Sequence, residues 1–167
     1  LSSAYLQAEL EPSEGEWYLI LDKHCVAGLP NESIAARDKL LTSGKAPVHR
    51  LRRSLYGRCR SGTTWIRNFL NSLKEWGYQP SEFDKALWWK KEGKEELWVA
   101  VYVDDMLASG SRKMLDRFWH EVRSRYEIKE GSEGAVEKFL GVQFRRYGRK
   151  YKLNMQECAN RLVQRYE

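Results

Sequence analysis

Two adjacent carboxylates stand out because they lie between apolar segments. Asp104 and Asp105 follow the apolar run Leu97–Tyr102 and precede Met106–Ser109. Two apolar runs around a short polar pair are typical of a β-hairpin, which would hold both carboxylates rigidly. Mg²⁺ prefers oxygen ligands of this kind, and two ions can clamp the attacking and leaving oxygens of a phosphoryl transfer. An ordinary turn is the alternative, because Asp is a common turn residue.

A basic segment is the second candidate for chemistry. Between Lys45 and Arg67 there is no acidic residue. The seven basic residues of this segment are Lys45, Arg50, Arg52, Arg53, Arg58, Arg60 and Arg67, whereas the whole chain carries a net charge of +6. The stretch Glu9–Glu16 is acidic instead. Concentrated positive charge favours a polyanion such as nucleic acid as the partner, and a solvated surface is the alternative.

The composition excludes several other classes of protein. With 42% hydrophobic and 31% charged residues, the 167-residue chain is typical of a globular domain rather than a disordered one. No apolar run approaches the ~20 residues of a membrane span. The three cysteines lie far apart, which argues against a zinc site or a disulfide framework and favours a reducing intracellular compartment.

The positions of apolar residues predict the elements that would hold these groups. We expect helices at residues 65–76 and 114–126, with Thr63 or Thr64 capping the first, Gly77 ending it and Ser111 capping the second. We expect strands at 86–90, 97–102, 106–109, 139–146 and 150–153, the last two turning at Tyr147–Gly148, and a final helix at 156–166. Residues 27–47 read as a long connection with a short helix near 33–41. This order predicts an α+β fold with an antiparallel sheet and helices packed on one face.

Several segments resemble one protein family in order along the chain. The segment Tyr102–Gly110 resembles the catalytic turn of copia-type retrotransposon reverse transcriptases. Leu51–Gly57, followed by Trp65, is similar to that family's Leu-Lys-Lys-Ser-Leu-Tyr-Gly segment. Ala4–Leu6 and Phe139–Gly141 are similar to segments near its nucleotide site and its primer grip. The resemblance implies a reverse-transcriptase palm, as a single partial domain over residues 1–167.

The resemblance also implies roles for single residues. Asp104 and Asp105 would be catalytic ligands of Mg²⁺ or Mn²⁺. Tyr5 would lie under the incoming sugar, with Tyr56 and Gly57 under the nucleotide. Nucleic acid would be contacted by Arg50, Arg52, Arg53, Arg58, Arg60, Phe139, Leu140 and Gly141.

The chain also departs from the family pattern. The family's third catalytic carboxylate is an Asp expected immediately before Leu1, and the fingers region is expected upstream of it. After Gly57 the family's Leu-Lys-Gln-Ala-Pro-Arg is replaced by Arg58–Thr63. We therefore expect a fragment of an RNA-directed DNA polymerase that is inactive alone.

The expected partners follow from the same resemblance. They are an RNA template, a DNA primer, deoxynucleoside triphosphates and the rest of a polyprotein with fingers and ribonuclease H, but no membrane. The expected location is intracellular, either cytoplasmic in a virus-like particle or nuclear. A non-catalytic nucleic-acid-binding module, or a decayed relic, is the alternative function.

Overall fold

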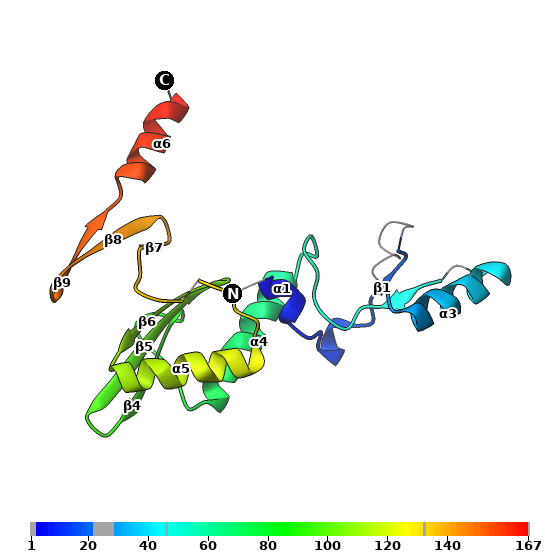
Figure 1. The fold of residues 1–167 in the computed structure, drawn as a ribbon, viewed down its shortest axis with the longest axis horizontal. Coiled ribbons are helices and arrows are strands. Elements are labelled where there is room, and N and C mark those ends of the chain that lie inside the picture. The colour runs from blue at the N-terminus through cyan, green and yellow to red at the C-terminus, as the bar shows by residue number, and fades with distance from the viewer. Residues whose placement is uncertain (1–2, 22–28, 46, 132, 167) are drawn as a thin grey trace. The chain divides into compact units, whose positions relative to one another are not determined.

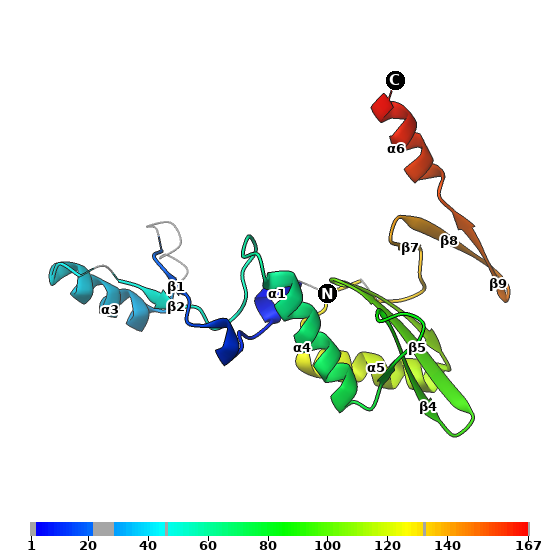
Figure 2. The ribbon, with the colours of Figure 1, turned by 180° about the vertical axis from the view of Figure 1, so that it is seen from behind.

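A computed structural model describes residues 3–21, 29–45, 47–131 and 133–166 of the chain. The chain forms two compact units, which Figures 1 and 2 show as ribbons. One unit is Tyr5–Trp65, and the other is Ile66–Glu167 with Leu1–Ala4. We describe each unit by itself.

The unit Tyr5–Trp65 consists mainly of short elements. They are α1 (Ala4–Gln7, which begins in the other unit), η1 (Pro12–Glu14), β1 (Tyr18–Leu19), α3 (Asn31–Thr42) and β2 (His49–Arg50). β1 and β2 pair antiparallel. The short helix predicted near 33–41 is confirmed and is slightly longer, whereas residues 27, 28 and 46 of the predicted connection lie outside the described residues. No residue of α3 is buried, so apolar packing does little to hold this helix.

Helix α4 (Ser61–Glu75) confirms the predicted amphipathic helix. Its apolar side chains at helical spacing, Trp65, Phe69 and Leu73, are fully buried. Gly77 ends the helix with a φ of 84° while its N–H donates to the Lys74 carbonyl, as a C-terminal cap does. The predicted cap at Thr63 or Thr64 is wrong.

The helix begins two residues before Thr63. It starts there because the Ser61 N–H donates to the Arg58 carbonyl and the Ser61 hydroxyl to the Leu55 carbonyl. Thr64, now inside the first turn, instead donates its hydroxyl towards the Arg60 carbonyl and Glu14.

A four-stranded antiparallel sheet forms the best-packed part of the larger unit. Its strands, in spatial order, are β3 (Gln79–Pro80), β4 (Leu87–Glu92), β5 (Glu95–Tyr102) and β6 (Asp105–Gly110). Alternate residues Leu97, Val99 and Val101 are buried, and helix α5 (Arg112–Arg125) packs against β5 and β6. The predicted hairpin around the two carboxylates is therefore confirmed.

Helix α5 joins this sheet to helix α4. The Ser111 hydroxyl accepts a hydrogen bond from the Met114 N–H, which confirms the predicted cap. Phe118 is fully buried with its ring centroid 5.8 Å from that of Tyr78. At the end of α5, the Tyr126 hydroxyl lies 2.6 Å from the Ser72 hydroxyl of α4. The core of this unit is thus continuous from α4 through α5 to β5.

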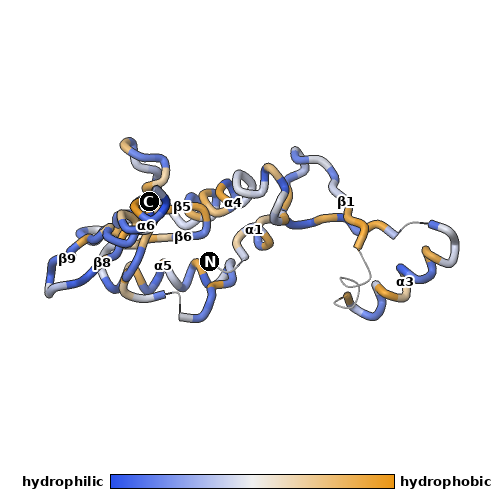
Figure 3. The backbone as a smooth tube through the Cα atoms, turned by 90° about the horizontal axis from the view of Figure 1, so that it is seen from above, coloured by the Kyte–Doolittle hydropathy of each residue, from blue (hydrophilic) through white to orange (hydrophobic). Residues whose placement is uncertain are grey.

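The last part of the chain forms a second antiparallel sheet and a helix. The elements are β7 (Lys138–Phe139), β8 (Val142–Tyr147), β9 (Lys150–Asn154) and α6 (Gln156–Tyr166). The final helix and the hairpin are confirmed, with the hairpin turn at Gly148–Arg149, one residue later than predicted. Strands β8 and β9 are largely hydrophilic (Figure 3).

The predicted single strand at 139–146 is wrong. It is broken by a turn at Leu140–Gly141, where φ is 49° and 81°. Positive φ at both central residues is the pattern of a type I′ turn. The turn reverses the chain so that Phe139 pairs with Val142.

Candidate functional site

The turn that carries the two carboxylates is tight. Tyr102, the last residue of β5, pairs with Asp105, the first residue of β6. Val103 and Asp104 alone therefore form the turn. Val103 has a φ of 53°, a conformation that costs a β-branched residue free energy. Strain of this kind is concentrated at functional sites, where the surrounding structure maintains it. The turn is therefore a functional-site candidate on geometry as well as on residue type.

Both carboxylates are accessible at this turn. Asp104 and Asp105 are exposed, Asp104 within the turn and Asp105 at the first position of β6. Within the described residues there is no group of three or more metal-binding side chains. Mg²⁺ is often bound by one or two carboxylates together with substrate phosphates and water. Two adjacent exposed carboxylates fit that manner of binding, whereas the described residues do not form an all-protein cage.

The aromatic candidates lie together in the unit Tyr5–Trp65. The ring centroids of Tyr5 and Tyr56 are 4.9 Å apart, and 60% of Tyr56 is exposed. Gly57 has a φ of 86°, which a side chain would disfavour. A Cβ on Gly62, in the first turn of α4, would lie 3.6 Å from the Tyr5 hydroxyl. The predicted proximity of Tyr5 to Asp104 joins the two units and stays a prediction.

Residues 49–54 of the basic segment pair through their backbone with residues 8–19, which include the acidic stretch. The Leu10 N–H donates to the Arg52 carbonyl, and the Leu51 N–H to the Trp17 carbonyl. Arg50 forms an exposed ion pair with Glu16, with 3.0 Å between nitrogen and oxygen. Arg50 and, as described below, Arg58 thus have carboxylate partners among the described residues.

Three predicted nucleic-acid-binding arginines remain open to solvent. Arg52, Arg53 and Arg60 are all exposed, and none of them forms an ion pair with a described acidic residue. The backbone of Arg53 forms an antiparallel bridge to Glu9. These three guanidinium groups are available to phosphates.

Arg58 is different because its side chain is buried. Only 8% of its side chain and 5% of that of Glu14 are exposed, and its two terminal nitrogens lie 3.2 and 3.1 Å from Glu14 Oε1. The guanidinium carbon lies 4.9 Å from the centre of the Trp17 ring. The Thr64 hydroxyl donates to the same Glu14 oxygen over 2.6 Å. The sequence-based interpretation missed this cluster, although the opposite charges of the two stretches were a signal for it.

The environment of Glu14 favours its charged form. Burial by itself raises the pKa of the Glu14 carboxyl. Hydrogen bonds from Thr64, the Glu11 N–H and Arg58 outweigh that effect, so that the pKa of Glu14 is lowered. The Glu14 carboxylate is therefore ionised at neutral pH.

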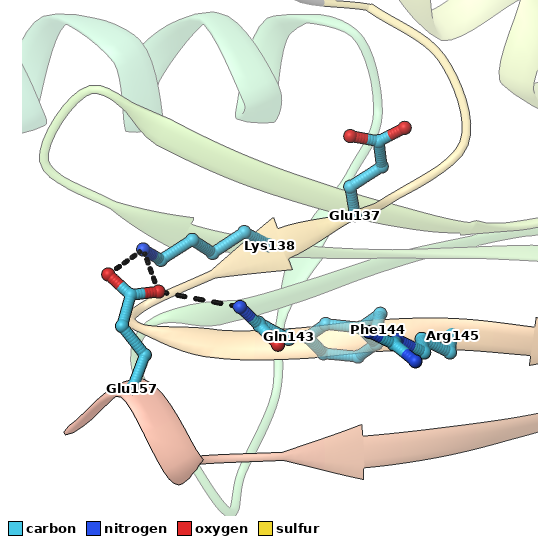
Figure 4. A pocket seen from close by; sticks show the side chains of 6 residues that line it. All are labelled: Glu137, Lys138, Gln143, Phe144, Arg145 and Glu157. Atoms are coloured by element: carbon cyan, nitrogen blue, oxygen red, sulfur yellow. Dashed lines mark hydrogen bonds and ion pairs between the residues drawn. The ribbon is translucent and has the colours of Figure 1, made fainter. Parts of the chain in front are cut away.

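The candidate primer-grip turn lies beside a shallow hollow. Phe139 ends β7, and Leu140, 48% exposed, forms the turn with Gly141. The hollow, of about 510 Å³, is lined by Glu137, Lys138, Gln143, Phe144, Arg145 and Glu157. Figure 4 shows Lys138 and Gln143 directed towards Glu157; the Lys138 ammonium donates to Glu157 over 2.8 Å and the Gln143 amide over 3.4 Å. These contacts join α6 to strands β7 and β8.

Comparison with known proteins identifies the family. Residues 38–167 match the sequence model of the reverse transcriptase (RNA-dependent DNA polymerase) family, so the chain belongs to that family. The prediction that it is, by family, an RNA-directed DNA polymerase is therefore confirmed. No solved structure matches the chain.

The relatives are retrotransposon proteins. The chain is 34% identical over 89 residues to a protein of transposon Ty5-1 from Saccharomyces cerevisiae, covering 53% of this chain and 28% of that protein. It is 30% identical over 100 residues to the retrovirus-related Pol polyprotein from transposon RE1 of Arabidopsis thaliana, covering 59% of this chain and 7% of the polyprotein. A similar match, 29% identical over 100 residues, is to the polyprotein of transposon RE2. The resemblance to copia-type elements is thus confirmed, and the chain spans a small part of each relative.

Proposed function

We propose that this chain forms the palm of an RNA-directed DNA polymerase that adds deoxynucleotides to a primer 3′ end by two-metal catalysis. The observation that carries the proposal is the tight turn with two exposed carboxylates in a member of the reverse transcriptase family. Asp104 is the main ligand of Mg²⁺ or Mn²⁺, and Asp105 supports it. The metal neutralises charge on the phosphates while the protein positions the reacting groups.

The aromatic cluster binds the incoming nucleotide in this proposal. Tyr5 lies under the sugar, where its ring leaves no room for a 2′-hydroxyl. Tyr56 and Gly57 lie under the nucleotide and the template base, because the absence of a side chain at Gly57 permits close approach of the backbone. The contact between the Tyr5 and Tyr56 rings, whose centroids lie 4.9 Å apart, supports a common role.

The exposed cations bind the template backbone. Arg52, Arg53 and Arg60 supply charge-assisted contacts to phosphates, which fix register without reading sequence. The turn formed by Phe139, Leu140 and Gly141 contacts the primer. Arg50 also belongs to this set. Its ion pair with Glu16 is exposed, so that a phosphate can displace Glu16.

The complete polymerase needs further parts of the polyprotein. The described residues hold no group of three metal-binding side chains, so we propose that residues 1–167 act as part of one polymerase domain in which other parts supply further metal ligands. The implied partners are an RNA template, a DNA primer, deoxynucleoside triphosphates and a ribonuclease H. The implied location is intracellular, as for a particle-borne or nuclear polymerase. Within the described residues, no helix has the length and apolar character needed to cross a membrane.

A second candidate function is nucleic-acid binding without catalysis. Its support is that Arg52, Arg53 and Arg60 stay exposed while the loop after Gly57 departs from the family pattern. Such a module would bind RNA with strong salt dependence and no need for Mg²⁺. A decayed relic would show neither property.

Primer extension separates these functions. The test uses the polyprotein segment that contains this chain, an RNA template and a DNA primer. Asp104→Asn should reduce the rate roughly a thousandfold, because a metal contact contributes several kcal/mol to transition-state stability. Asp84→Asn, in an exposed turn elsewhere, is the matched control and should leave the rate unchanged. Binding of the RNA template without any primer extension that depends on Asp104 would favour the non-catalytic module.

A further inference from the structure

A buried polar cluster in the unit Tyr5–Trp65 is unexplained by the proposed contacts to nucleic acid. It consists of Glu14, Arg58 and Thr64, with Trp17 beneath the guanidinium group. Removing two charges from water is costly unless they are paired and hydrogen bonded. Here Glu14 accepts from Arg58 and Thr64 on one oxygen and from the Glu11 N–H, over 3.0 Å, on the other. The buried Nε of Arg58 has no hydrogen-bond partner among the described residues, so the cluster is held through the two terminal nitrogens of the guanidinium group.

Arg58 is poorly placed to bind a phosphate. Both terminal nitrogens are directed to Glu14, and the plane of the group lies over Trp17. A phosphate could reach Arg58 only by separating a pair whose side chains are almost completely buried. Arg60, two residues later, is exposed, and no described carboxylate forms an ion pair with it that a phosphate would have to displace.

The cluster lies directly beside the candidate nucleotide-binding turn. Arg58 follows Gly57, and its N–H approaches the Leu55 carbonyl at 3.4 Å, so that residues 55–58 form one turn. Glu14 thereby anchors that turn across 44 residues of sequence. On the N-terminal side of this turn, the Ser54 N–H donates to the Ala8 carbonyl over 2.8 Å. Ala8 directly follows the helix that carries Tyr5.

We infer that Glu14 and Arg58, with Thr64, are positioning residues that hold Tyr56 and Gly57 against Tyr5, and that Arg58 is not a nucleic-acid contact. The value of this arrangement for nucleotide binding rests on the proposed function. The positioning of the Tyr56 ring by Glu14 and Arg58 does not depend on that function. Arg58 thereby moves from the nucleic-acid-binding residues to those that support Tyr5 and Tyr56.

The first test measures the contact between the Tyr5 and Tyr56 rings by NMR in the full chain with labelled tyrosines. Glu14→Gln and Thr64→Val should abolish the nuclear Overhauser effect between the two rings. Thr64→Ser keeps the donor hydroxyl and should restore it. Glu16→Gln, which breaks the exposed pair with Arg50, is the matched control and should have no effect. A ring contact that persists in both Glu14→Gln and Thr64→Val would overturn the inference.

The second test separates positioning from phosphate contact. Binding of an RNA–DNA hybrid is followed by fluorescence anisotropy at several salt concentrations. Each lost phosphate contact should lower the slope of log affinity against log salt by roughly 0.7 to 0.9. Arg60→Gln should show that loss, whereas Arg58→Gln should keep the slope of the unaltered chain. An equal loss for both variants would return Arg58 to the phosphate contacts.

The two proposals can fail independently. The NMR test contains no nucleotide, so its outcome does not depend on polymerase activity. In primer extension by the polyprotein segment, Glu14→Gln should raise KM for the deoxynucleotide and leave kcat unchanged, as expected for a residue that acts on binding. If extension is independent of Asp104 while the ring contact still depends on Glu14, the polymerase proposal fails and the positioning role stands.

Discussion

The hairpin sheet with helix α5 and the unit Tyr5–Trp65 are stabilised in different ways. In the first, large apolar side chains such as Leu97, Val99 and Phe118 are completely removed from water. In the second, α3 buries no residue, and a buried ion pair and backbone hydrogen bonds join distant segments. Apolar packing fixes the carboxylate turn, whereas polar contacts fix the aromatic pair. The two halves of the candidate site should therefore respond to different substitutions.

Truncation in the apolar core should have the largest effect. Phe118→Ala removes a fully buried ring and should lower the free energy of unfolding by about 3–5 kcal/mol. Leu162→Ala, at a side chain in α6 that is exposed, is the control and should change it by less than about 0.5 kcal/mol. Urea unfolding measures both. Similar losses in the two variants would mean that α5 is not the centre of the core.

Removal of the Glu14 charge should have an intermediate effect that depends on pH. Glu14→Gln should destabilise the unit Tyr5–Trp65 by about 2 kcal/mol at neutral pH, because Arg58 loses its charged partner. The pKa of Glu14 is lowered on folding, so its contribution is present above the ordinary value of 4.5 and is lost as the pH falls through the lowered value. The backbone amides of residues 54–64 should therefore lose protection from hydrogen exchange in acid in the unaltered chain. In Glu14→Gln their protection should depend less on pH. Identical pH profiles would contradict the role of the pair.

Relief of strain in the carboxylate turn should have a smaller effect of opposite sign. Val103→Asn replaces a β-branched residue at positive φ by one that tolerates it, and should stabilise the hairpin by up to about 1 kcal/mol. Thermal unfolding measures the gain. An unchanged or lower Tm would show that Val103 is not strained in solution.

Loss of the exposed cations should have the smallest effect on stability. Replacing Arg52, Arg53 and Arg60 together by Ala should change the free energy of unfolding by less than about 0.5 kcal/mol in total. The same variant should reduce the slope of log affinity against log salt by about 2, as three lost phosphate contacts would. Anisotropy titration of an RNA–DNA hybrid is the measurement. An unchanged slope would make this segment a solvated surface.

The same contrast explains what the sequence could predict. Helices α4 and α5 and the hairpin around Asp104 follow from apolar periodicity, because each residue's burial is encoded by its near neighbours. The break at Leu140 was missed because leucine gives no turn signal and Gly141 alone is ambiguous.

The Glu14–Arg58 pair was missed for a different reason. Its two residues are 44 positions apart, so their pairing produces no periodic pattern in the sequence. The role of Tyr56 was suggested by family resemblance, but its ring contact with Tyr5 required the fold. Resemblance thus located the candidate residues, and the structure showed which of them lie together.

Metal binding at the carboxylate turn tests the central proposal most directly. Mn²⁺ added to the isotope-labelled chain should broaden the amide resonances of residues 102–106 selectively, with weak affinity because one turn supplies only two carboxylates. In Asp104→Asn that broadening should disappear, while Asp116→Asn, an exposed carboxylate on α5, should retain it. Equal broadening of the turn in the unaltered chain and in Asp104→Asn would show that Asp104 is not a metal ligand and would contradict the polymerase assignment of this site.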